Sequence, residues 1–256
     1  MEITIERLYQ GLPTTINDKE YLSTKDYVEP FINTMKKFGC SFVVNVQTPK
    51  QLTFSFGEQN ITFNKVWVQA VMPEKVDKDG YAETYNLIYG LDVRTPVYKI
   101  FKAYKDKRTS NLYVFNAQWL NVYELQPGKA FNDLEPVVRN MMQQMDDSQL
   151  IFKKLKLSFI DEKQTFLGEA IEKSMVFNFK HKGGTVKISP NMLVKAYEMV
   201  YMDSSSKYFI PNTEECSQFN YLEALSSLIV AEFKKDIYNV FEKSAIISEI
   251  FNTLKV

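Results

Sequence analysis

The chain has 256 residues, and its 31 basic residues balance its 31 acidic residues, so the formal net charge is zero. Hydrophobic residues make up 45% and aromatic residues 14%, which argues against a disordered chain and predicts a folded globular protein. This length suits one domain or two closely packed subdomains.

The sequence carries no signal for export or membrane insertion. The stretch from Glu2 to Asp18 holds acids and no apolar run, unlike a secretory signal, and no apolar segment approaches the length of a membrane span. The two cysteines, Cys40 and Cys216, indicate free thiols in a reducing compartment. We therefore expect a cytoplasmic protein without membrane contact, or a virion protein if a phage encodes it.

The first predicted elements are a short strand over Glu2–Leu8 and a well-marked helix. Ser23 can cap this helix, Asp26 completes the capping pattern, and Gly39 stops it. The apolar residues on one face of the helix are Val28, Phe31, Ile32, Met35 and Phe38. That face predicts a helix that packs on a hydrophobic core.

From Cys40 to Ala117 the apolar pattern changes to period two, which is typical of strands. The connections are short, except for a longer polar loop over Pro73–Ala82, so an antiparallel meander of about six strands follows. The predicted strands are Ser41–Gln47, Leu52–Phe56, Ile61–Met72, Thr84–Val93, Tyr98–Tyr104 and Asn111–Ala117.

After Gly128 the pattern is mainly helical, with one hairpin over Met175–Ser189. The predicted helices are Phe131–Asp147, Gln149–Leu157, Glu162–Lys173, Pro190–Met202 and Phe219–Leu254, the last in two or three pieces. Strands grouped first and helices grouped later predict the α+β class. We expect a β-sheet region over 1–128 and a helical region over 129–256, as two parts or as one continuous domain.

Several enzyme chemistries are excluded by residue counts and spacing. His181 is the single histidine, so a two-histidine zinc site cannot form, and no phosphate-binding glycine loop occurs. The acid pairs Asp146–Asp147 and Asp161–Glu162 fit charged helix termini. We therefore expect no catalytic residue, no metal and no cofactor, with a carboxylate-based metal-dependent enzyme as the remaining enzymatic alternative.

The hairpin Val97–Ala117 interleaves aromatic and basic residues and holds five basic residues against one acid, Asp106. Basic side chains here can meet phosphates, while tyrosines such as Tyr98 can stack on bases. The alternative is that the aromatic rings fill the core, because each strand mixes both residue kinds on one face. On that interpretation only the turn Lys105–Arg108 remains exposed and available to bind a ligand.

A second basic hairpin surrounds Gly183 and Gly184. If these glycines are the two turn residues, Lys180 lies directly opposite Lys187. Like charges across a strand pair are unfavourable unless they are solvated or neutralised, so this face should meet water or an anion. An ordinary solvated surface is the competing interpretation.

The run YGLDVRTPVYKIFKAYKDKRTSNLYVFNAQWLNVYEL, Tyr89–Leu125, and the stretch SKYFIPNTEE, Ser206–Glu215, resemble uncharacterised proteins of phages and plasmids, as in crAss-like gut bacteriophages. The resemblance implies a viral or mobile-element origin. It transfers no catalytic or binding residue.

These observations predict a non-enzymatic, phage-type protein that binds nucleic acid, preferably single-stranded, through two basic hairpins. The alternative is a virion assembly protein or an inhibitor of a host protein. The charge is polarised along the chain, because Glu214–Glu249 holds seven acids and three lysines. Such polarisation allows either nucleic-acid binding by the basic middle region or head-to-tail self-association. The predicted nucleic-acid contacts are Lys99, Lys102, Lys105, Lys107, Arg108, Tyr104, Tyr113, Lys180, Lys182 and Lys187.

Overall fold

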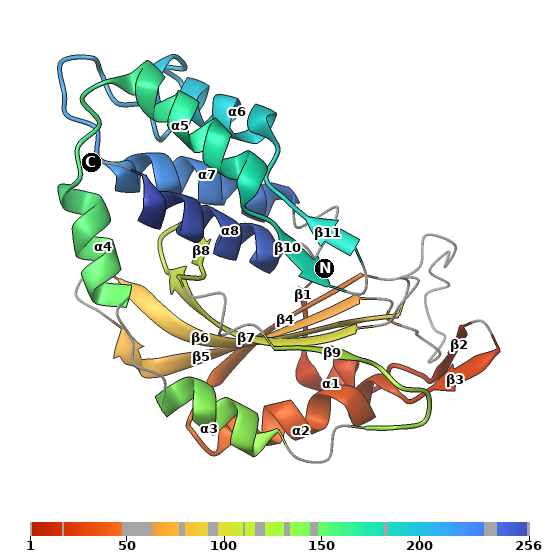
Figure 1. The fold of residues 1–256 in the computed structure, drawn as a ribbon. Helices are drawn as coiled ribbons and strands as arrows, with labels where there is room; N and C mark the ends of the chain where they lie inside the picture. The colour runs from red at the N-terminus through yellow and green to blue at the C-terminus, as the bar shows by residue number, and fades with distance from the viewer. Residues whose placement is uncertain are drawn as a thin grey trace. The chain divides into compact units, whose positions relative to one another are not determined.

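The structure is a computed structural model of the chain (Figure 1). It describes residues 2–16, 18–47, 63, 65–76, 80–91, 97–109, 111–115, 121–130, 134–143, 148–181, 184–232 and 240–254. The chain forms two compact units, each described by itself below. The first unit holds Met1–Tyr104 and Gln118–Gln144, and the second holds Lys105–Ala117 and Met145–Val256.

An antiparallel sheet forms the centre of the first unit. Its strands follow the order β1-β4-β5-β6-β7, and β9 pairs with β7 beyond this path. The strands are β1 Glu2–Ile3, β4 Ser41–Gln47, β5 Lys65–Val76, β6 Tyr81–Gly90, β7 Val97–Asp106 and β9 Asn121–Glu124. Together with the helices, this sheet confirms the predicted α+β class and the antiparallel meander.

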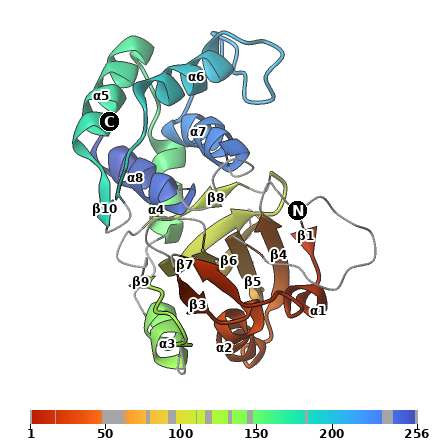
Figure 2. The same ribbon diagram turned by 90° about the vertical axis from the view of Figure 1, so that its right-hand side faces the viewer.

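Two helices, α2 (Thr24–Lys36) and α3 (Glu135–Gln143), lie on the same face of this sheet (Figures 1 and 2). The capping box of α2 forms as predicted, since Ser23 Oγ accepts from the Asp26 backbone N–H while the Asp26 carboxylate accepts from the Ser23 N–H. Apolar side chains of α2 and of the sheet pack into one core, which includes Phe31, Val68 and Leu87.

The first predicted strand, Glu2–Leu8, is wrong over most of its length. Only Glu2–Ile3 is strand, and a one-turn helix, α1, covers Ile5–Leu8. Thr4 caps α1 by accepting a hydrogen bond from the Arg7 backbone N–H at 3.2 Å. The cap at Thr4 starts the helix and so ends the strand at Ile3. The alternating apolar pattern of the sequence did not predict this cap.

The strand predictions differ in outcome. Ser41–Gln47 is confirmed as β4, whereas Leu52–Phe56 lies outside the described residues. The loop predicted over Pro73–Ala82 is too long, because β5 continues to Val76 and β6 begins at Tyr81. The sequence also missed a hairpin of β2 (Thr14–Ile16) with β3 (Lys19–Tyr21), and it missed β9.

Helices dominate the second unit, and α7 contacts α4, α6, α8 and the short strand β8. The elements are β8 Leu112–Tyr113, α4 Ser148–Leu157, α5 Lys163–Val176, β10 Phe179–His181, β11 Gly184–Val186, α6 Pro190–Tyr201, α7 Gln218–Glu232 and α8 Val240–Thr253. The predicted helical stretch Phe219–Leu254 contains α7 and α8, and residues 233–239 between them lie outside the described part.

The second basic hairpin forms with a different register from the one predicted. Lys180 pairs with Thr185, and His181 pairs with Gly184. The pairing of His181 with Gly184 is incompatible with a turn whose two central residues are Gly183 and Gly184. The predicted opposition of Lys180 and Lys187 is wrong, and the electrostatic argument for an anion site on that pair no longer holds.

Candidate anion-binding surface

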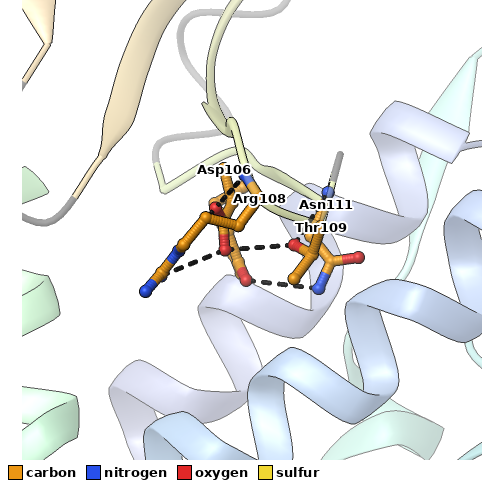
Figure 3. A network of polar contacts seen from close by, with 5 residues as sticks. Asp106, Arg108, Thr109 and Asn111 are labelled. Carbon is orange, nitrogen blue, oxygen red and sulfur yellow. Dashed lines mark hydrogen bonds and ion pairs between the residues drawn. The ribbon is translucent and has the colours of Figure 1, made fainter. Parts of the chain in front are cut away.

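A buried carboxylate, that of Asp106, organises the turn between β7 and β8 (Figure 3). Its Oδ1 accepts a hydrogen bond from the Arg108 backbone N–H at 2.8 Å, and its Oδ2 accepts one from Thr109 Oγ1 at 3.0 Å. The Arg108 guanidinium also donates to it, from Nε to Oδ1 at 3.2 Å and from Nη2 to Oδ2 at 3.3 Å. The backbone bond from Asp106 N to Asn111 O, at 3.0 Å, closes the turn.

The contacts of Asp106 favour its charged form. Burial by itself would raise the pKa of this carboxyl, but the hydrogen bonds from Arg108 and Thr109 outweigh it and lower the pKa below the ordinary value. Arg108 stays 63% exposed while it makes this contact. The turn therefore holds a guanidinium in one place and leaves much of it open to solvent.

Contacts with α7 fix the same turn within the second unit. Asn111 Nδ2 donates to the backbone oxygen of Glu223 at 3.1 Å, and Ser226 Oγ donates to the backbone oxygen of Leu112 at 3.0 Å. Tyr113 lies in an aromatic cluster, with ring centroids 5.6 Å from Phe152 and 6.0 Å from Phe219. The turn thus belongs to the packed structure of the unit.

The charges of basic residues from three separate elements act on the carboxyl of Glu223. Burial raises the pKa of this carboxyl, the nearby charge of Asp106 raises it further, and Arg108, Lys156 and Lys207 oppose the increase. Arg108 comes from the β7–β8 turn, Lys156 from α4, and Lys207 from the segment between α6 and α7. We call Arg108, Lys156, Lys207 and Glu223 the Glu223 cluster.

Aromatic rings lie beside two cations of the Glu223 cluster. Lys156 Nζ lies 5.3 Å from the ring centroid of Phe219, and Lys207 Nζ lies 4.8 Å from that of Tyr208. Phe219 is buried, whereas Tyr208 is half-buried and Lys207 is exposed. The pair Lys207–Tyr208 therefore presents a cation and part of an aromatic ring to solvent.

Four of the predicted nucleic-acid contacts are buried side chains. Lys99 and Lys102 are each 1% exposed, and Lys102 Nζ pairs with Glu83 Oε2 at 3.4 Å. Tyr104 and Tyr113 are buried as well. Burial removes these four from the residues that can meet a phosphate or stack on a base, and it favours the alternative in which the aromatic rings fill the core.

The other predicted contacts differ in their exposure. Lys107 and Lys187 are exposed, and Lys105 is half-buried. The side chain of Lys180 and the whole of Lys182 lie outside the described residues. In the first basic hairpin, Lys107 and Arg108 are therefore the predicted contacts whose charges are exposed.

A metal site needs several ligating side chains close together, and a membrane span needs a long apolar helix. Among the described residues, no group of three or more His, Cys, Asp or Glu side chains could hold a metal ion. No described helix is both long enough and apolar enough to cross a bilayer.

Comparisons with protein families, with curated proteins and with solved structures found no match for this chain. The proposed function therefore depends only on the geometry and charges of the site. The predicted contacts did not include Lys156, Lys207 or Glu223, because these residues lie far apart in the sequence and no local pattern links them. Only the fold allows their charges to act on one another.

Proposed function

We propose that the chain is a non-enzymatic protein that binds single-stranded nucleic acid through the Glu223 cluster. The observation that carries this proposal is the position of two basic elements against α7. Asn111, in the Arg108 turn, donates to the Glu223 backbone oxygen, and Lys156 Nζ lies 5.3 Å from the ring of Phe219, one turn before Glu223. The charges of Arg108, Lys156 and Lys207 all act on the Glu223 carboxyl. A phage or plasmid origin, which the sequence resemblance implies, fits such a protein.

Phosphate recognition follows from the chemistry of these cations. Arg108 presents a planar guanidinium that Asp106 holds in place, so little side-chain freedom is lost when an anion binds. Lys107, exposed at the same turn, and Lys207 add mobile ammonium groups. Together these groups match a backbone that carries one charge per nucleotide.

A single strand is favoured because its bases are accessible for stacking. Tyr208 takes the stacking role that the sequence suggested for Tyr104 and Tyr113, since its ring is half-buried beside Lys207. The negative charge of Glu223 opposes phosphate binding, so this cluster should bind with modest affinity that depends strongly on salt.

The test measures binding of a labelled single-stranded oligonucleotide as salt is varied. The variant Lys107→Gln/Lys156→Gln/Lys207→Gln removes three charges and leaves the Arg108–Asp106 contact in place. Each lost contact with a single-strand phosphate lowers the slope of log affinity against log salt by about 0.7, so we expect a decrease of about 2.

The matched control is Lys19→Gln/Lys129→Gln/Lys195→Gln, which removes the same charge from exposed lysines elsewhere. If control and test variants change the slope equally, only net charge matters and the site is wrong. Absence of measurable binding by the wild type at low salt contradicts the proposed function itself.

A further inference from the structure

The outer face of α4 combines exposed leucines with lysines. Phe152 and Leu155 are buried on the inner face of this helix, whereas Leu150 is 66% exposed and Leu157 is 63% exposed. The two leucines are seven residues apart, so they lie on the same side of the helix. Lys153 and Lys154, both exposed, lie between them.

Another exposed apolar side chain follows shortly after the end of the helix. Phe159, two residues after Leu157, is 43% exposed. Isolated apolar residues are common on protein surfaces, but three large ones grouped on one short segment and interrupted by cations are typical of an interaction site. The charges identify the kind of partner, which should be apolar and acidic.

A second exposed face of the same unit has the complementary character. On α5, Met175 is 71% exposed and Val176 is 69% exposed. Glu172, one turn before Met175, is exposed, and Glu169 is half-buried beside it. The two lysines of α5, Lys163 and Lys173, are half-buried.

We propose that the α4 face of one copy of this chain binds the α5 face of a second copy. Lys153 and Lys154 would meet Glu169 and Glu172, while Leu150 and Leu157 would pack on Met175 and Val176. Pairing α4 with α4 would instead place lysines opposite lysines, which is unfavourable. The contact is therefore heterologous, and it joins copies head to tail.

This arrangement predicts weak association that grows with protein concentration. Each face offers only a few apolar side chains, which is at the small end of specific interfaces. A heterologous contact leaves one free face at each end of an assembly, so copies add until a ring closes or a chain extends. Both faces belong to the second unit, and the contact needs none of the residues in the Glu223 cluster.

The experiment exchanges the charges of the two faces in separate variants. Lys153→Glu/Lys154→Glu makes both faces acidic, and Glu169→Lys/Glu172→Lys makes both faces basic. In sedimentation of purified, nucleic-acid-free protein, we expect the wild type to associate and each variant alone to associate at least about tenfold more weakly. An equimolar mixture of the two variants should regain association, because opposite charges then meet at both kinds of contact.

The mixture separates this proposal from other arrangements. A wild type that stays monomeric at every concentration overturns it, and so does a mixture that fails to associate while both variants remain folded by circular dichroism. The control variant Lys19→Glu/Lys195→Glu changes the net charge as Lys153→Glu/Lys154→Glu does, but at exposed lysines of β3 and α6, and it should associate like the wild type. Oligonucleotide binding by the wild type reports separately on the proposed function.

Discussion

At the scale of single residues, burial decides the role of each basic side chain. Lys102 and Arg108 stand six positions apart in one hairpin, yet Lys102 is enclosed with Glu83 whereas Arg108 extends into solvent from its contact with Asp106. The local sequence around both is aromatic and basic. Composition therefore identified a charged hairpin but could not separate structural cations from accessible ones.

Lys102 provides a test of that distinction. The variant Lys102→Met keeps a side chain of similar length and leaves the buried Glu83 short of its cation, so the free energy of unfolding should fall by about 3 kcal/mol. Urea denaturation measures this change, and Lys129→Met, at an exposed position, is the control. If Lys102→Met instead lowers the oligonucleotide affinity and leaves the stability unchanged, Lys102 contacts nucleic acid and the prediction is wrong.

Glu223 offers a gain-of-function prediction. Its charge opposes phosphate binding in the Glu223 cluster, so Glu223→Gln should raise oligonucleotide affinity roughly three- to tenfold, equivalent to about 1 kcal/mol. Glu198→Gln, at an exposed position on α6, should leave the affinity nearly unchanged. Fluorescence anisotropy measures both, and weaker binding by Glu223→Gln would contradict the proposed site.

The raised pKa of Glu223 predicts a pH dependence of the wild-type protein that the Glu223→Gln variant should lack. A carboxyl whose pKa is higher in the folded state binds its proton more readily there, so its contribution to stability is greatest at low pH and is lost as pH rises through the folded pKa. Oligonucleotide affinity of the wild type should likewise rise as pH falls through that value. Glu223→Gln should remove this part of both pH profiles.

At the scale of elements, sequence patterns that span only a few residues predicted helix and strand boundaries best. The capping pattern of Ser23 and Asp26 predicted the start of α2, and the structure contains both of its hydrogen bonds. The β10–β11 hairpin shows the limit of such signals. Its Gly-Gly pair allowed two turn positions, and the formed register pairs Lys180 with Thr185.

The cap of α2 gives a prediction at this scale. Ser23→Ala removes the hydroxyl that accepts from the Asp26 backbone N–H, so the free energy of unfolding should fall by about 1 kcal/mol. Ser204→Ala, at an exposed serine outside any described helix, serves as the control. Denaturant titration compares the two, and equal effects would show that the capping box contributes little.

At the scale of the whole molecule, a net charge of zero conceals separate charged surfaces. The expected boundary near residue 128 does not coincide with the two units, because the tip of the β7–β8 hairpin is part of the second unit and α3 is part of the first. Sequence polarity pointed to self-association between opposite charges. The exposed faces of α4 and α5 now supply specific surfaces for the sedimentation test.

The sequence by itself determined the α+β class, the antiparallel meander, the main helices and the cap of α2. Those features depend on the alternation of apolar residues in strands, on their helical periodicity and on hydrogen bonds between near neighbours. All three can be recognised from the order of residues in the sequence. Tertiary structure alone decided that Lys99 and Lys102 are buried, that β10 and β11 pair in their formed register, and that the charges of Lys156 and Lys207 act on Glu223. These outcomes depend on which distant segments pack together, and the competing arrangements share the same local pattern.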